Sequence, residues 1–417
     1  MIGFLRKALP RMTRPSTPPT RLDDALLGIA IYYLTSVVMF LGFSFGYQFL
    51  VRGSIAAPRG IGLLGAFDSA GGRWYRQILE NGYGREPGGH SSAAFFPAYP
   101  LISRAVRAAS GLPTQAALLV VSNASLFFAL IILARYVRAR FPLAPQALAD
   151  WTLLAMGLFP TGCFFRMCYT ESTFLLLAIG AMYGIERRWP IPALVFLVGL
   201  ETATRATGVA LLAPLGVYIW QSQPTCAARA WRLALWLPLA CWGLIAFMVF
   251  QYVAFGEPLA FARAQATWRI GPSVELPAKL KLLVTLEPLG AVYDSSSPAY
   301  WAAWDVHRLP WFSLYFANPI FFVASIVLLA IGISKRWLTL GEGLLVALLM
   351  LIPFVTRAHE MGMAGMGRFV AVAFPIYIVL GHLLARLPTA ISIGFLVIFG
   401  FLLGAYSALF AAGYLIV

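Results

Sequence analysis

Charged residues are scarce in this chain. Asp, Glu, Lys and Arg make up only 11% of its 417 residues, whereas 60% are hydrophobic. A soluble protein carries about 25% charged residues, so this composition excludes an ordinary soluble globular fold. Several apolar runs reach the length of about 20 residues that a membrane helix needs. Because these runs are continuous rather than alternating, they disfavour a membrane β-barrel and predict an all-α polytopic membrane protein.

Acids, cysteine and histidine are also few. The 16 acids face 31 Lys and Arg residues, which gives a formal net charge of +15. No soluble basic domain is present to bind nucleic acid, so anionic membrane lipids or phosphate-bearing substrates are the expected partners. There is no His/Cys metal spacing and no glycine-rich nucleotide loop. The cysteines lie in or near apolar runs, where packing is the expected role; they are Cys163, Cys168, Cys226 and Cys241.

Eleven apolar segments are predicted to span the membrane. They lie near residues 25–50, 114–134, 147–167, 171–186, 190–203, 206–222, 233–255, 312–333, 340–356, 368–385 and 388–414. Residues 1–22 read as a basic cytoplasmic tail, and residues 23–417 as a single transmembrane domain. Segment 94–110 contains Pro97, Pro100, Arg104 and Arg107, so we place it at the membrane interface or as a re-entrant piece.

Short basic connections set the expected orientation. With a cytoplasmic amino terminus, the basic turns at 135–140, 187–188, 229–232, 335–336 and 386 fall inside a plasma (inner) membrane. Two longer loops, 52–93 and 256–310, then face the periplasm or exterior and are expected to contain short interfacial helices, one of them near 276–289. We see no internal repeat, which argues mildly against an inverted-repeat transporter.

The first outer loop carries Asp68 within a glycine-rich and aromatic stretch, 67–83. A carboxylate just outside a membrane helix can accept a proton from a bound hydroxyl, and general-base help of this kind contributes roughly 10²–10⁴ in rate. The alternative is a helix cap or a solvated loop charge. Trp74, Tyr75 and Tyr83 follow. Aromatic rings stack on sugars, but Trp and Tyr also mark membrane interfaces, and both interpretations stay open.

Further polar groups stand at the ends of later apolar segments. Ionisable groups there are functional by default, and Tyr169 and Glu171 are counted as pocket residues. Arg205 is suited to clamping a phosphate oxygen; the alternative is an internal pair with Glu201, four residues earlier. Arg357, His359 and Arg368 cluster before a late helix. We assign the two arginines to phosphate and His359 to the pocket, with interfacial anchoring as the alternative.

The stretch from Asp68 to Tyr83, followed by Phe95-Phe96-Pro97-Ala98-Tyr99-Pro100, resembles the PIG-V family of mannosyltransferases, and its bacterial branch in particular. Other segments that resemble the family are 169–172, 203–208 and the late helix from Gly367-Arg368-Phe369. The stretch with Gln265 and Trp268 is similar to the bacterial branch, so both join the expected pocket. Phe67 is a departure, since the family usually has Trp before the acid.

The resemblance implies a GT-C fold of many membrane helices, an active site on the outer face, a polyprenyl-phosphate sugar donor, typically of mannose, and an inverting transfer. Asp68 would be the catalytic base. The acceptor would be a hydroxyl of a glycan, lipid or protein. No metal is required by this scheme, although it leaves room for a divalent cation between Asp68 and the phosphate. Alternatives are a transporter or flippase for a lipid-linked or anionic substrate, a non-catalytic partner subunit, or the same fold acting on another sugar.

Overall fold

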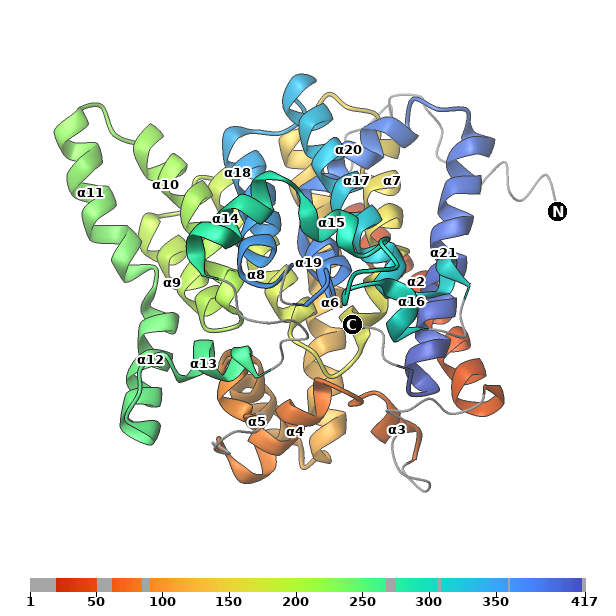
Figure 1. The fold of residues 1–417 in the computed structure, drawn as a ribbon. Coiled ribbons are helices and arrows are strands. Elements are labelled where there is room, and N and C mark those ends of the chain that lie inside the picture. Colours follow the sequence, from red (N-terminus) through yellow and green to blue (C-terminus); the bar gives the residue numbers. More distant parts are fainter. Residues whose placement is uncertain are drawn as a thin grey trace.

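The computed structural model describes residues 20–50, 62–84, 91–267, 275–305, 309–358 and 361–414. Within these ranges the chain is helical and contains no strand (Figure 1). Each of the eleven predicted apolar segments coincides with a helix or a broken pair of helices. The predicted all-α polytopic membrane fold is therefore confirmed. Most of the predicted amino-terminal tail lies outside the described residues, and the first helix begins at Arg21, just inside that tail.

Five helices are long and apolar enough to cross a membrane by themselves among the residues described. These are α2 (Arg21–Phe49), α6 (Thr114–Arg140), α17 (Leu314–Ser334), α18 (Leu340–Pro353) with the π-helical turn η5 (Phe354–Ala358), and α21 (Thr389–Ala411). Three further pairs would each make one bent span: α7 (Ala147–Gly157) with η2 (Pro160–Arg166), α11 (Cys226–Leu239) with α12 (Trp242–Phe255), and α19 (Met366–Val372) with α20 (Pro375–Leu384).

The bends fall at or close to prolines. Pro160 follows the end of α7, where the chain turns by 79°, and Pro375 begins α20 after a turn of 77°. Proline lacks the backbone N–H that a continuous helix would use, so it ends or kinks a helix but is tolerated in a first turn. The first break precedes η2, which leads to Tyr169, and the second break follows α19, which carries Arg368.

Three of the predicted spans are short. They are α8 (Glu171–Glu186), α9 (Ile191–Thr202) and η3 (Ala206–Leu211) running into α10 (Leu212–Gln221). With 12 residues, α9 is about 18 Å long, which is less than the ~30 Å of a bilayer core. The prediction that residues 190–203 cross the membrane as a full span is therefore corrected. The turn between α9 and η3 holds Arg205.

The remaining helices belong to the predicted outer loops and their surroundings. They are α3 (Leu63–Ala66), α4 (Gly72–Asn81), η1 (Ser92–Ala94), α5 (Ala98–Ser110), α13 (Ala260–Ala266), α14 (Leu276–Val284), α15 (Glu287–Ala291), α16 (Trp301–Trp304) and η4 (Pro310–Phe312). Helices α3, α4 and α5 lie at the lower edge of Figure 1, with α13 above them against η1, and we call this region the loop end. The ambiguous segment 94–110 is thus the short helix α5, with one buried and one exposed face.

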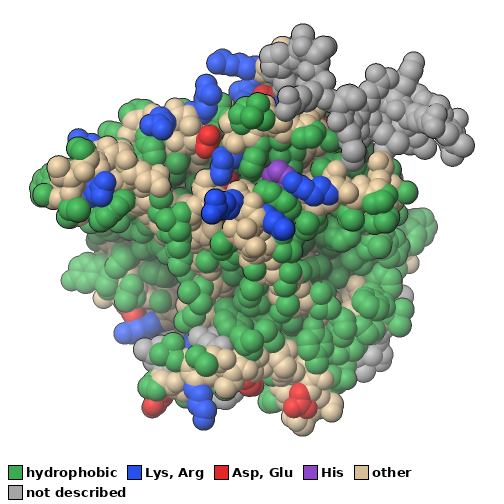
Figure 2. All heavy atoms as spheres, turned by 90° about the horizontal axis from the view of Figure 1, so that it is seen from above, with side chains coloured by type: hydrophobic (Ala, Val, Ile, Leu, Met, Phe, Trp, Pro, Cys, Tyr) green, Lys and Arg blue, Asp and Glu red, His purple; other side chains and the backbone are tan. Residues whose placement is uncertain are grey.

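The opposite end of the molecule is basic. Arg138 at the end of α6 pairs with Asp24 at the start of α2, and Arg140 lies 3.6 Å from Glu342 at the start of α18. Glu342 also accepts a 2.6 Å hydrogen bond from Tyr136. Figure 2 looks onto this end, where many Lys and Arg side chains gather. The basic turns at 135–140, 335–336 and 386 lie close to one another, because Phe141 and Trp337 both contact His382 and the Arg386 guanidinium lies over the Trp337 ring. We call this the basic end.

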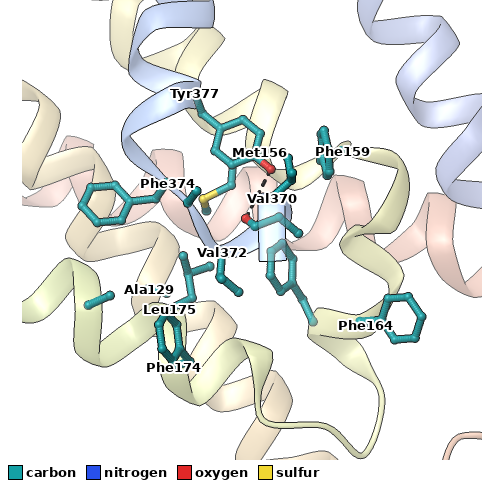
Figure 3. Close-up of a cluster of buried hydrophobic side chains, with 14 of the residues drawn as sticks. Ala129, Met156, Phe159, Phe164, Phe174, Leu175, Val370, Val372, Phe374 and Tyr377 are labelled. Carbon is teal, nitrogen blue, oxygen red and sulfur yellow. Dashed lines mark hydrogen bonds between the residues drawn. The ribbon is translucent and has the colours of Figure 1, made fainter. Parts of the chain in front are cut away.

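A tightly packed core supports the break between α19 and α20. In Figure 3, side chains of α6, α7, α8, α19 and α20 converge on it, among them Met156, Phe174 and Phe374. The buried Tyr377 hydroxyl donates a 3.2 Å hydrogen bond to the carbonyl of Ala371, next to the break. Because interiors are packed as densely as organic crystals, this core fixes the short helix α19 and with it Arg368.

Helices α2 and α21 pack closely through small residues. A Cβ atom at Gly42 would lie 2.2 Å from the carbonyl oxygen of Gly404, and one at Gly46 would lie 1.9 Å from that of Ala408. Both helices thus carry a small-xxx-small pattern, which lets helix backbones approach each other within a membrane. This contact supports the loop end, because Phe43 of α2 stacks on Phe67 with ring centroids 3.8 Å apart.

We expect Gly46→Leu to force α2 and α21 apart and to destabilise the protein by about 1–3 kcal/mol, the usual effect of overpacking. The measurement is the thermal unfolding midpoint of the purified protein in detergent. The matched control is Gly394→Leu on the exposed face of α21, where a Cβ meets nothing within 4 Å. Equal shifts for the two variants would contradict the role given to this contact.

Candidate active site

Asp68 follows α3 in a turn at the loop end, and its side chain is only 2% exposed. Nη1 of Arg76, one turn into α4, lies 3.2 Å from Oδ2, yet that oxygen accepts no hydrogen bond from the residues described. Burial raises the pKa of the Asp68 carboxyl above its ordinary value, against a lowering effect of Arg76 and of Gln115. A buried carboxylate with an uncommitted oxygen and a raised pKa is well suited to accept a proton.

The backbone of this turn is unusual. Ala70 has φ +52°, in the left-handed region that residues with a side chain seldom adopt. Such conformations persist where the surrounding structure enforces them, and they concentrate at functional sites. Here the enforcing contact is Tyr169, whose hydroxyl accepts a 3.0 Å hydrogen bond from the Gly71 N–H and donates a 3.0 Å bond to the Ser69 carbonyl.

The Tyr169 ring connects the Asp68 turn to Arg368. The Arg368 guanidinium lies over the ring, 4.6 Å from its centroid, and 4.8 Å from that of Phe164. A cation between two aromatic faces gains electrostatic attraction and is held in one orientation. The hydroxyl of the same tyrosine holds the Asp68 turn, so one buried side chain places the candidate base and a candidate phosphate ligand relative to each other.

Glu171 joins two of the predicted arginines. It begins α8 and is fully buried. Its Oε1 accepts hydrogen bonds from Nε of Arg368, at 2.7 Å, and from Nη2 of the same residue. Nη1 of Arg205 lies 3.0 Å from this oxygen but makes no hydrogen bond, and Oε2 of Glu171 has no partner. Arg205 therefore keeps uncommitted N–H donors inside the protein.

Arg357 approaches the same cluster from the π-helical turn η5. Its guanidinium lies 6.0 Å from the centroid of the Phe369 ring, and that of Arg205 lies 5.0 Å from the same centroid. π-helical turns are frequent at functional sites. Helix α14 of the second outer loop packs against this turn. The structure thus brings Arg205, Arg357 and Arg368 together around Glu171 and Phe369, and we call these four polar residues the arginine cluster.

The alternative partner for Arg205 is not used. Glu201 is fully buried, but neither of its carboxylate oxygens makes a hydrogen bond in the part of the chain described. The Arg205 guanidinium pairs with Glu171 instead. Residue 205 lies beyond the end of α9, between α9 and η3, where its backbone is extended. The i,i+4 spacing that brings Glu and Arg together on a helix therefore does not apply.

The predicted pocket residues occupy different surroundings. Tyr75 of α4 is buried, and its hydroxyl lies within electrostatic reach of Glu171, Arg205 and Arg368. Trp74 stacks on Phe95, and Tyr83 donates a 2.9 Å hydrogen bond to the Phe95 carbonyl. Gln265 is half-buried on α13, which packs against η1. Trp268 and His359 lie outside the described residues.

Two further residues were missed from the sequence. Arg76 is the cation beside Asp68, and no local pattern signals a pair eight residues apart. Arg166, at the end of η2, is buried and has no acidic partner among the residues described; it donates to Ser36 Oγ at 2.9 Å and to Thr35 Oγ1. Arg166 lies inside an apolar segment, and an ionisable residue in such a segment indicates a functional site. This signal could have identified it from the sequence. Arg166 braces η2 two residues before Cys168, whose N–H donates to the Phe67 carbonyl at 3.2 Å.

No group of three or more His, Cys, Asp or Glu residues that could hold a metal occurs within the ranges that the structure describes. The four cysteines are free thiols, and Cys163 and Cys168 are buried. The buried Asp68 carboxylate can accept a proton, and the guanidinium groups of the arginine cluster can bind an anion.

No known protein family matches this chain, and neither does any curated protein. The solved structures that are similar to it include two of ArnT from Cupriavidus metallidurans. With the crystal structure bound to undecaprenyl phosphate, the identity is 16% and the TM-score 0.48, over 89% of this chain and 62% of that one. With the apo crystal structure, the identity is 13% and the TM-score 0.35, over 85% and 78%. This chain thus spans less than two thirds of the first of these structures.

We expect Tyr169→Phe to loosen the Asp68 turn. The change leaves the Gly71 N–H and the Ser69 carbonyl without their partner, and an unsatisfied buried group costs about 1–3 kcal/mol. The thermal unfolding midpoint should fall, and hydrogen exchange at residues 69–72 should accelerate. Tyr218→Phe is the matched control, since its hydroxyl also donates to a carbonyl, that of Trp189, but at the surface. If both variants behave alike, Tyr169 does not hold the turn.

Proposed function

We propose that this chain is a membrane glycosyltransferase of the GT-C type, in the bacterial branch of the PIG-V family. It moves a sugar, mannose in particular, from a polyprenyl-phosphate donor to a hydroxyl acceptor on the extracytoplasmic face. One observation carries the proposal. The segments that resemble the family are far apart in sequence, yet Tyr169, Arg368, Glu171 and Arg205 form a continuous series of contacts. The Tyr169 hydroxyl joins this series to the turn that carries Asp68 through the backbone of Ser69 and Gly71.

In the proposed reaction Asp68 takes the proton of the acceptor hydroxyl, and the hydroxyl oxygen attacks the anomeric carbon of the sugar. The bond from that carbon to the phosphate oxygen breaks, and its electron pair stays on the phosphate. Attack from the side opposite the leaving phosphate inverts the anomeric configuration. The products are the new glycoside, protonated Asp68 and a polyprenyl phosphate monoester. No metal is required for this scheme.

The arginine cluster supplies what the leaving group needs. Negative charge grows on the phosphate as the bond breaks, so fixed cations stabilise the transition state more than the ground state. Arg205 suits this role because its guanidinium is largely buried and keeps free N–H donors. Arg368 is held by Glu171 and two aromatic rings, so it is already oriented before a phosphate arrives.

The distribution of charge favours an enzyme over the alternative of a transporter or flippase. A transport pathway needs polar groups along the way from one side to the other. The buried acids differ between the two ends: Asp68, Glu171 and Glu201 each have a carboxylate oxygen without a hydrogen bond among the residues described, whereas Asp24 and Glu342 at the basic end are paired with arginines. With the basic end in the cytoplasm, the site opens toward the extracytoplasmic face of the membrane.

We expect Asp68→Asn to lower sugar transfer by a factor of about 10²–10⁴, the usual contribution of a general base. Asparagine keeps the shape of the side chain but cannot accept the proton. The measurement is transfer of radiolabelled mannose from a polyprenyl-phosphate donor by the purified protein.

The control for this experiment is Asp294→Asn. This change alters an acid of the second outer loop whose side chain accepts hydrogen bonds from Ser296, and it should leave the rate unchanged. Transfer by Asp68→Asn at close to the wild-type rate would remove Asp68 as the base. Absence of transfer by the wild-type protein with mannose, glucose and arabinose donors alike would overturn the proposed function.

The pH dependence of the reaction should report on Arg76. The base acts as a carboxylate. Because the pKa of Asp68 is raised, the carboxylate becomes protonated at a higher pH than an exposed aspartate does. Arg76→Gln removes a cation that lowers this pKa, so the acid limb of kcat/KM should move upward by about 1 unit or more. Arg73→Gln, which removes a weaker influence, should move it less. Equal shifts, or a downward shift for Arg76→Gln, would contradict the assignment.

A further inference from the structure

The phosphate changes its charge during the proposed transfer. The donor is a phosphodiester with one negative charge, whereas the product is a monoester whose second pKa is about 6, so that it is mainly a dianion at neutral pH. A site that binds anions through several arginines therefore holds its product more strongly than its substrate. Turnover requires that this difference be limited. The inference below concerns this same site and rests on the proposed function.

Glu171 is placed where it can limit this difference. It is fully buried among cations, with Arg368 bonded to one carboxylate oxygen and Arg205 3.0 Å from the same oxygen. Its second oxygen has no partner, and Nη1 of Arg205 makes no hydrogen bond. A carboxylate whose only task was to anchor both arginines would be expected to use both oxygens and to bond both guanidinium groups. The observed contacts neutralise Arg205 without occupying its donors.

We propose that Glu171 sets the net charge of the arginine cluster so that the phosphate monoester product is released. In this role it touches no reacting atom and acts through Arg205 and Arg368. The Coulomb energy between two charges is proportional to their product. Removing the negative charge of Glu171 therefore strengthens binding of a dianion by about twice the free energy gained by a monoanion at the same place. The factor by which the affinity for the monoester rises is therefore the square of the factor by which the affinity for the diester rises.

The test compares two ligands that differ in charge. Geranyl phosphate is the monoester probe and methyl geranyl phosphate the diester probe, each titrated into the full-length purified protein in detergent at pH 7.5. We expect Glu171→Gln to tighten binding of both. If the diester gains about fivefold, the monoester should gain about 25-fold. In the transfer assay the same variant should show stronger inhibition by geranyl phosphate.

A charge series separates charge from scaffolding. Counting residues 171, 205 and 368, the wild type carries one net positive charge, as does the double variant Glu171→Gln/Arg205→Met. Arg205→Met alone carries none, and Glu171→Gln carries two. The preference for monoester over diester should rise with this net charge, and the double variant should match the wild type. If Glu171→Gln alone does not fold, the series still tests the inference, since the wild type and two variants remain, at two levels of net charge.

Two results would overturn the inference. If both ligands bind the wild type but the preference does not follow the net charge, Glu171 is only a scaffold, and the proposed glycosyltransferase is untouched. If neither ligand binds the wild type, the phosphate site itself is wrong, and the proposed function falls with the inference. Glu171→Asp keeps the negative charge. It should retain the wild-type preference whether Glu171 tunes the charge or is only a scaffold, so it serves as a control for folding of variants at this position.

Discussion

A fully buried carboxylate needs cations beside it, and this requirement organises the centre of the molecule. Burial of an unpaired charge costs many kcal/mol, and removal of one member of a buried pair costs about 3–5 kcal/mol. Glu171 meets the requirement with Arg368, 197 residues further along the chain, and with Arg205. Helix α8, the turn after α9 and helix α19 must therefore meet, and the breaks beside η2 and between α19 and α20 allow them to do so.

The aromatic side chains around this contact have two effects. They hold the guanidinium groups by their faces, as Phe164 and Tyr169 do for Arg368 and Phe369 does for Arg205. They also exclude water, which strengthens every charge interaction among the groups they enclose. Tyr169 extends the effect to the Asp68 turn through its hydroxyl. The acid and the arginines are thus parts of one rigid arrangement, as preorganised electrostatic catalysis requires.

The helices of this fold could be predicted from the sequence because each apolar segment is a local pattern. The charge partners could not, because they depend on how distant segments meet. Arg205 illustrates the difference: spacing favoured Glu201 four residues earlier, but α9 ends before Arg205 and the backbone leaves the helix. Arg76 had no local signal either. Arg166 did have one, an arginine within an apolar segment, but what it binds, Thr35 and Ser36 of α2, is again a matter of packing.

Both parts of the site, the Asp68 turn and the arginine cluster, favour transfer of negative charge from Asp68 to the phosphate. In the proposed reaction Asp68 loses a negative charge when it takes the proton, and the phosphate gains one when the sugar leaves, so the total charge of the site is unchanged. Burial disfavours the charged form of Asp68 and raises its pKa, which makes proton acceptance easier. At the other side of Tyr169, the arginines favour the added charge on phosphate. If the surroundings of Asp68 were as cationic as those of the phosphate, the transfer of negative charge from Asp68 to the phosphate would no longer be favoured. The acid, for which burial outweighs the nearby Arg76, therefore differs from the phosphate position, which faces several arginines, and this difference is the feature through which this structure would drive transfer.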